Sequence, residues 1–298
     1  MSESQSVVRR QRILGIQIGQ GTRWIVYRFV RNPNFAFGVV VLVAMSTLAV
    51  FAPLVDRTDP LKLSPYERLQ APSAKHWFGT DPTGRDLYSR TVHGARLSLL
   101  VGFSVVIAVS IVGGSLGLIT GYSKRIDNVL MRFMDGLMAF PTLVLALALI
   151  ALLGSSIQNV IIAITVVDSP RMVRIVRSSV LSLREQTFIE AVRAVGAPTW
   201  RILLVHIAPN TLAPVLVQVT FIFAGAIMTE ASLSFLGAGS PPHIPSWGNL
   251  ISQGRDYLQI ALWMILFPGL FLGLTVLAVN LVGDAIRDAL DPKLRRRL

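Results

Sequence analysis

Residues 97–122 read LSLLVGFSVVIAVSIVGGSLGLITGY and contain no charged side chain. A helix needs about 20 consecutive apolar residues to cross the hydrocarbon core of a bilayer, so this run predicts a transmembrane helix. The composition of the whole chain agrees: of 298 residues, 52% are hydrophobic and only 15% are charged, and the mean hydropathy is +0.59. A soluble domain carries about 25% charged residues. We therefore expect an all-α, polytopic membrane protein.

Five further runs predict spans, which gives six transmembrane helices in all. They are Phe35–Val55, Gly136–Leu153, Asn159 to about Ile175, Thr211 to about Phe235, and Ile260–Gly283. The run from Asn159 is the weakest, because Asp168, Pro170 and Arg171 interrupt it, and it spans only if these groups find partners inside a bundle. The arginine-rich start lacks a signal-peptide pattern, so we read the first run as an uncleaved helix.

The distribution of Lys and Arg predicts the orientation. With the N-terminus in the cytoplasm, 20 of the 28 Lys and Arg residues lie on the cytoplasmic side and 8 lie outside, which is the usual bias of membrane proteins. This topology places both termini and residues 187–210 in the cytoplasm. It also accounts for the net charge of +12 and makes membrane lipid the expected partner of the basic residues. Nucleic acid is not expected, because these residues lie between apolar spans.

Two segments outside the membrane have recognisable local patterns. Asp81 followed by Pro82 predicts an N-cap and a first-turn proline, opening a helix that leads to the second span with Arg90 on its polar side. The proline-rich segment Gly239–Ile251 predicts an irregular cap, with Trp247 near the headgroups.

Several kinds of chemistry are not expected of this chain. GGSLG at 113–117 matches a serine nucleophile motif, but that motif needs a strand-to-helix turn, and Gly113, Gly117 and Gly121 are spaced for close helix packing instead. No catalytic residue, metal site or bound cofactor is predicted. The chain has no cysteine, its four histidines lie in different loops, and no lysine follows a glycine as an ATP-binding loop requires.

The segment Thr187–Asn210 predicts two short helices. Thr187 and Glu190 form a capping-box pattern, Gly196 is placed for a left-handed helix end, and Pro198 suits the first turn of a second helix. The apolar positions Ile189, Val192 and Val195 would give the first helix one face, and Trp200, Leu203, Leu204 and Ile207 would give the second helix another. Two readings stay open: a rigid element that transmits force to another subunit, or two helices lying on lipid headgroups.

Three ionisable residues within the spans are candidate pathway or gate residues: Asp168, Arg171 and Glu230. Asp168 and Arg171 are one helical turn apart, so a self-neutralising pair near the cytoplasmic end is the favoured alternative for these two. Glu230 could equally be an interface residue at the outer end of its span.

The motif EAVRAVGAPTWRILLVHIAPN, residues 190–210, resembles the EAA loop of the permease subunits of binding-protein-dependent ABC importers. Glu190, Ala191, Gly196 and Pro209 match that pattern, whereas Val192, His206 and Ala208 depart from it. Other stretches, among them FGTDPTGRDLYSR, MRFMDGLMAFP, EASLSFLGAG and GDAIRDALDP, resemble the C-type permeases of the dipeptide/oligopeptide/nickel branch.

The resemblance implies a type I importer permease fold in a bacterial inner membrane. Residues 1–92 would hold the N-terminal tail, first helix and outer loop, residues 93–291 the five-helix transport domain with a coupling loop at about 185–210, and residues 292–298 a basic tail. The implied partners are a paralogous B-type permease, two ATPase subunits that bind ATP and Mg, and an extracytoplasmic solute-binding protein. The coupling residues would be Glu190, Ala191, Arg193, Ala194, Gly196 and Pro209.

Under this resemblance the chain is a transport subunit and not an enzyme. Peptides are the leading substrate, and nickel, glutathione, opines and sugars are alternatives. An ATP-independent carrier is the competing class, but it would be expected to show inverted repeats or paired intramembrane charges. An intramembrane enzyme would need a serine–histidine or carboxylate pair at one depth, which the sequence does not offer.

Overall fold

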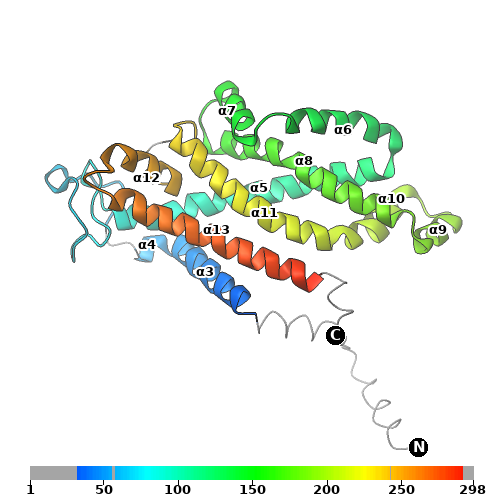
Figure 1. The fold of residues 1–298 in the computed structure, drawn as a ribbon, viewed down its shortest axis with the longest axis horizontal. Helices are drawn as coiled ribbons and strands as arrows, with labels where there is room; N and C mark the ends of the chain where they lie inside the picture. The colour runs from blue at the N-terminus through cyan, green and yellow to red at the C-terminus, as the bar shows by residue number, and fades with distance from the viewer. Residues whose placement is uncertain (1–31, 56–57, 242, 291–298) are drawn as a thin grey trace, which may run out of the picture.

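The computed structural model describes residues 32–55, 58–241 and 243–290, which form a bundle of helices (Figure 1). The longer helices are α3 (Pro33–Val50), α5 (Leu87–Tyr122), α6 (Lys124–Met138), α7 (Thr142–Leu153), α8 (Ile157–Leu183), α11 (Ala208–Phe235) and α13 (Trp263–Leu290). Shorter elements are α4 (Ala52–Val55), α9 (Thr187–Ala194), α10 (Thr199–Arg201) and α12 (Trp247–Gly254). β-Structure in these ranges amounts to one isolated bridge between Thr80 and Asp86. The expected all-α fold is confirmed.

Four helices of the described chain are long and apolar enough to cross a membrane: α3, α5, the continuous helix Thr199–Phe235 that contains α11, and α13. The region predicted as the third span is not straight. It begins as α6, breaks before Thr142, and turns by 95° into α7, so this bent pair is a fifth candidate span. The helix α8 runs unbroken through Pro170, as the fourth span required. It also carries Asp168 and three arginines, and the count of six spans therefore stays a prediction.

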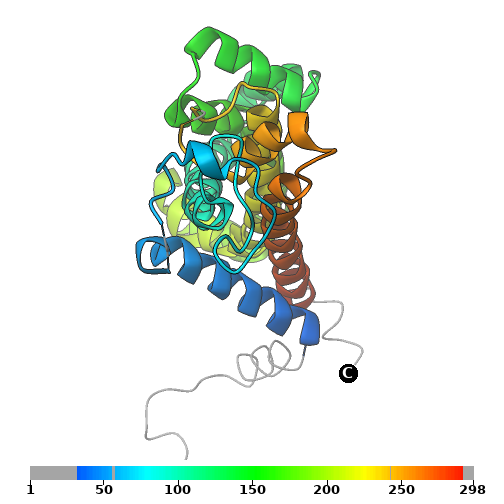
Figure 2. The ribbon, with the colours of Figure 1, turned by 90° about the vertical axis from the view of Figure 1, so that its left-hand side faces the viewer.

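The two ends of the bundle are built differently. We call residues 58–91 and 243–261 the cap, and residues 187–207 the elbow. The cap, with α12, lies at one end of the long axis, and the elbow lies at the other (Figure 1). The start of α3 and the end of α13 lie toward the elbow end, and α3 crosses the outside of the bundle obliquely, against α13 and α5 (Figures 1 and 2).

The helix pair α5–α8 forms the centre of the bundle, and glycines bring the two backbones together. A Cβ atom added to Gly113, Gly117 or Gly121 would lie 2.8, 2.6 or 2.5 Å from the Cβ of Met172, Val176 or Val180. These separations are shorter than any that packed side chains adopt. The predicted packing role of the glycines spaced four apart is therefore confirmed, because only residues without a side chain permit this contact.

Two predictions from local sequence are wrong in the cap. The helix α5 begins at Leu87 and is capped by Asp86, whose Oδ2 accepts from the Ser89 amide at 2.9 Å. Asp81, the predicted cap, instead holds a turn by accepting from the amides of Thr83 and Arg85. The reason is that Gly84 at φ +77° reverses the chain between Asp81 and the helix, so no helix can run on from Pro82.

The second correction concerns residues predicted to be polar-facing or at the headgroups. The side chain of Arg90 is fully buried, where Nη1 donates to Asp81 and, at 2.9 Å, to Gln253. Trp247 is also fully buried, and its Nε1 donates to the Thr91 carbonyl at 3.0 Å. Gln253 and Thr91 lie more than 150 positions in sequence from Arg90 and Trp247, and local patterns cannot reveal such partners.

Candidate subunit-coupling site

The first half of the elbow is α9, and it ends as its sequence predicts. Gly196 has a φ of +83°, the Ala197 amide donates to Val192 at 3.3 Å, and the Gly196 amide donates to Arg193 at 3.0 Å. This pair of bonds is the Schellman motif, which needs a left-handed residue after the helix. The chain therefore turns sharply and rigidly after α9.

The start of α9 differs from the predicted capping box. The helix does begin at Thr187, but Gln186 occupies the cap position and makes no side-chain hydrogen bond to the helix. Glu190 is exposed and, among the described residues, has no ion-pair partner. The Glu190 carboxylate does not cap α9, and it therefore remains exposed at the surface, where a partner could bind it.

The second half of the elbow is continuous with α11. Pro198 is the residue before the helix and not its first turn, and Thr199–Phe235 forms one helix whose residues Ile202–Ile207 adopt a π conformation. This wide turn lies directly before Pro209, whose missing N–H removes one helical hydrogen bond. The second half of the elbow is therefore the beginning of a long helix, and a movement of this half must move α11.

The π turn also changes which apolar side chains face the bundle. Ile202 and Ile207, five residues apart, are both buried, whereas Trp200 is 62% exposed and Leu204 is 60% exposed. The predicted face of Trp200, Leu203, Leu204 and Ile207 is wrong, because a π turn advances the apolar stripe by more than four residues per turn.

Buried isoleucines fix the elbow to the bundle. Ile189, Ile202 and Ile207 belong to the same apolar cluster as Val176 and Val180 of α8. Val195, which was predicted to share the face of Ile189, is 89% exposed. The elbow therefore presents one side to the bundle and leaves a second apolar side uncovered.

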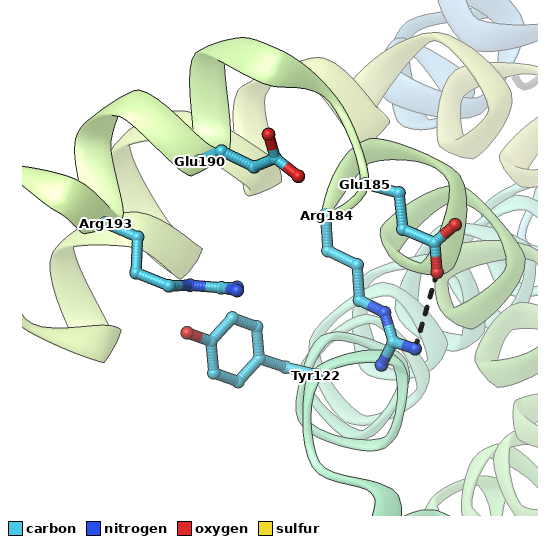
Figure 3. Close-up of a pocket in the computed structure, with 5 residues that line it drawn as sticks. All are labelled: Tyr122, Arg184, Glu185, Glu190 and Arg193. Atoms are coloured by element: carbon cyan, nitrogen blue, oxygen red, sulfur yellow. Dashed lines mark ion pairs between the residues drawn. The ribbon is translucent and has the colours of Figure 1, made fainter.

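A charged cavity of about 760 Å³ lies where the elbow meets the ends of α5 and α8. Its lining residues are Tyr122, Arg184, Glu185, Glu190 and Arg193 (Figure 3). The guanidinium of Arg193 lies 6.0 Å from the centre of the Tyr122 ring, and Arg184 Nη1 donates to the Gly121 carbonyl at 3.2 Å. These two contacts connect the elbow and α8 to the last turn of α5.

A second cavity, of about 500 Å³, lies on the other side of the turn at Gly196. It is bordered by Ala191, Val195, Pro198 and His206, among others. Of the six predicted coupling residues, Glu190 and Arg193 line the first cavity and Ala191 and Gly196 the second. Ala194 and Pro209 are exposed and line neither of these two cavities.

The candidate pathway residues lie apart from the elbow. Arg171 Nη1 is 3.5 Å from Oδ1 of Asp168, which is 4% exposed, so the predicted pairing across one turn is present. Glu230 is fully buried near the cap and accepts a hydrogen bond from Ser234 at 2.8 Å. Its Oε2 has no hydrogen-bond partner among the described residues.

Sequence reasoning missed two ion pairs that join α6 to α8. Arg174 Nη2 lies 2.6 Å from Asp135, and Arg177 Nη2 lies 2.7 Å from Asp127. A signal was available: Arg171, Arg174 and Arg177 recur every three residues and so share one side of a helix. A charged side chain facing lipid at the centre of a span costs about 2.5–3.5 kcal/mol, so such a series calls for acidic partners or water.

Residues 113–296 match the family described as binding-protein-dependent transport system inner membrane component, and residues 22–72 match the N-terminal transmembrane domain of oligopeptide transport permease C. The dipeptide transport system permease protein DppC of Alkalihalophilus pseudofirmus is 48% identical over 266 residues, covering 89% of this chain and 88% of that protein. The di/tripeptide permease DppC of Pseudomonas aeruginosa is 42% identical over 274 residues, covering 90% of each chain.

Among solved structures, the inward-facing MetNI methionine ABC transporter matches with a TM-score of 0.55 and 20% identity, over 69% of this chain and 98% of that one. This likeness shows a common fold. The chain belongs to the family of inner membrane components of binding-protein-dependent transport systems, the permease subunits of ABC importers. It is a multi-pass inner membrane protein and a transport subunit, whose family works with separate ATPase subunits and a binding protein.

Proposed function

We propose that this chain pairs with a paralogous B-type permease to form the translocation pathway of an ATP-driven peptide importer. Peptide as the substrate is supported by the names of the similar permeases, of dipeptides in one case and di- or tripeptides in another. Nickel, glutathione, opines or sugars are the alternatives. In this proposal residues 93–291 carry the transport domain, and an extracytoplasmic binding protein delivers the substrate at the cap end.

The elbow is the site where an ATPase subunit pushes on the permease. The observation that carries this proposal is that three buried isoleucines fix the elbow to the bundle, while the side that carries Val195 and Trp200 is exposed. A rigid element transmits displacement, and exposed apolar and charged side chains offer a surface for a partner. The elbow end is then cytoplasmic, and both termini lie on that side.

Glu190 holds the ATPase through an ion pair with a basic residue of that subunit, and Gly196 permits the turn that shapes the contact. Ala191, Arg193, Ala194 and Pro209 complete the surface. ATP and Mg bind to the partner subunits. Closure of the two ATPases moves the elbow, and α8 and α11 move with it because the elbow is continuous or tightly packed with both.

The test is charge reversal at Glu190 in the complete transporter, reconstituted in proteoliposomes with its binding protein. We expect Glu190→Lys to reduce peptide uptake per ATP hydrolysed by at least about 10-fold, because loss of a buried charge pair at an interface costs about 2 kcal/mol or more. Asp288→Lys is the matched control, since Asp288 is an exposed acid near the end of α13. Normal uptake by Glu190→Lys would contradict the proposed role of the elbow.

A further inference from the structure

The exposed side of α8 is polar over its second half. Arg171, Arg174, Ser178 and Ser182 are all exposed, and their spacing of three or four residues places them on one face. We call these four residues the polar stripe. The opposite face of α8, which includes Met172, Val176 and Val180, is buried against α5.

The position of the polar stripe along the bundle is fixed by the glycine contacts. Gly113 meets Met172, Gly117 meets Val176, and Gly121 meets Val180. These glycines belong to the uncharged run of α5, residues 97–122. Arg171, Arg174 and Ser178 therefore lie at the same depth as the part of α5 that crosses the membrane.

Arginines at this depth do not face lipid, because charged groups within a membrane face a bundle interior or a water-filled cavity. The neighbouring helix α6 agrees, since it contributes Asp135, whose side chain is 58% exposed, beside Arg174. By contrast, the exposed residue of α5 at the level of Ser178 is Ile119, which suits lipid.

We propose that the polar stripe lines the water-filled path of the substrate and that Arg171 and Arg174 bind its carboxylate group as it passes. This inference rests on the proposed function and names the chemistry of the substrate: a small molecule with a free carboxylate, such as a peptide with an unmodified C-terminus. The side chains of both arginines remain about half exposed, at 54% and 45%. Each guanidinium has five N–H donors, more than a single acid can use.

The acids beside the stripe pair with the arginines but leave some of their N–H donors unused. Asp168 lies 3.5 Å from Arg171, which is longer than a normal hydrogen bond, and Asp135 contacts only one nitrogen of Arg174. A passing carboxylate meets donors that are already oriented, and the nearby acids keep its binding weak enough for release.

The chain has no cysteine, so single cysteines report water access directly. The experiment uses the complete transporter in vesicles, with Ser178→Cys in the polar stripe and Ile119→Cys as the control at the same depth. The probes are an anionic and a cationic methanethiosulfonate reagent, neither of which crosses lipid. We expect Ser178→Cys to react at least 10-fold faster than Ile119→Cys. We also expect the anionic reagent to react faster at Ser178→Cys because the two arginines attract it. Adding Arg174→Gln should lower the ratio of the anionic to the cationic labelling rate at least 3-fold. A peptide with a free C-terminal carboxylate should slow the labelling, whereas the same peptide amidated at its C-terminus should not.

Equal slow labelling of both positions would overturn the proposal, and would mean that the stripe faces lipid or the second permease. Fast labelling with a rate ratio unaffected by Arg174→Gln and by Arg171→Gln would overturn the role of the arginines. Ser182→Cys repeats the measurement if Ser178→Cys does not assemble. ATP-driven uptake by the unmodified transporter is measured in the same vesicles, so a failure of the proposed function is seen separately from a failure of the stripe.

Discussion

The cap and the elbow lie at opposite ends of α5 (Figure 1) and differ in how their charged side chains are placed. In the cap, two large side chains are fully buried with partners in the chain: Arg90 donates to Asp81, and Trp247 donates to the Thr91 carbonyl. In the elbow, Trp200 and Val195 are exposed, and Glu190 has no ion-pair partner in the described part of the chain. The cap buries its Arg90–Asp81 pair within the chain, whereas the elbow leaves Glu190 exposed on the side that we propose an ATPase subunit contacts.

The buried groups of the cap and the exposed groups of the elbow contribute to different free energies, that of folding and that of binding. A buried charge stabilises a protein only while its partner stays in place, so the Arg90–Asp81 pair ties the cap to one arrangement. Exposed apolar groups contribute little to the stability of the isolated chain, but they provide binding free energy when a partner covers them. Substitutions at the two ends should therefore affect different measurements.

The largest effect on stability is expected at the cap. We expect Arg90→Met to lower the free energy of unfolding by up to about 3–5 kcal/mol, because the buried Asp81 carboxylate would lose its buried cation and keep only Arg85, whose Nε lies 3.4 Å away. Unfolding of the purified subunit in mixed detergent micelles, followed by circular dichroism, measures this change.

Arg255→Met is the control for that substitution, because Arg255 forms an exposed pair with Asp256 at 3.5 Å. Exposed pairs contribute about 0–1 kcal/mol, so this variant should unfold almost like the parent. If both arginine variants lost the same stability, the cap would not depend on its buried pair.

A smaller effect is expected where α5 meets α8 near the elbow. We expect Gly121→Ala to lower the free energy of unfolding by about 1–3 kcal/mol, because the new methyl group would lie 2.5 Å from the Cβ of Val180 and force the helices apart. The same unfolding measurement applies. It would show that the elbow end is tightly packed inside although its surface is incomplete.

Gly114→Ala is the matched control, since nothing lies within 4 Å of a Cβ at that position. Its stability should be unchanged or higher by up to about 1 kcal/mol, because alanine favours helix more than glycine does. A loss in Gly114→Ala as large as in Gly121→Ala would mean that the helix pair is not held by close glycine contacts.

The smallest effect on stability is expected at the exposed side of the elbow. Trp200→Ser should change the free energy of unfolding by no more than about 0.5 kcal/mol, as surface substitutions usually do. It should nevertheless weaken binding of the ATPase subunits at least about 10-fold, because exposed aromatic residues often dominate interfaces. Co-purification and titration of the ATPase onto the permease measure the binding.

Trp77→Ser supplies the comparison, since Trp77 is 45% exposed in the cap. This variant should bind the ATPase normally. Normal ATPase binding by Trp200→Ser as well would favour the reading in which the elbow lies on lipid headgroups.

Prediction from sequence succeeded where a single local pattern fixes the structure. Most of the long uncharged runs became helices, and Gly196 ends α9 in a left-handed turn. Prediction failed at Asp81, which the Asp-Pro pattern favoured as a helix cap. The chain reverses at Gly84, and the helix starts after Asp86 instead.

The sequence by itself determined that this is an all-helical membrane protein, where most of its spans lie, and that a rigid, glycine-turned element interrupts them. These properties depend on apolar runs and backbone preferences, which are local. Only the tertiary structure decided the 95° bend between α6 and α7, the burial of Arg90 and Trp247, and the polar face of α8 at membrane depth. The burial of Arg90 and Trp247 depends on Gln253 and Thr91, which are more than 150 positions away in sequence, because a polar group is stable inside a bundle only where a partner meets it.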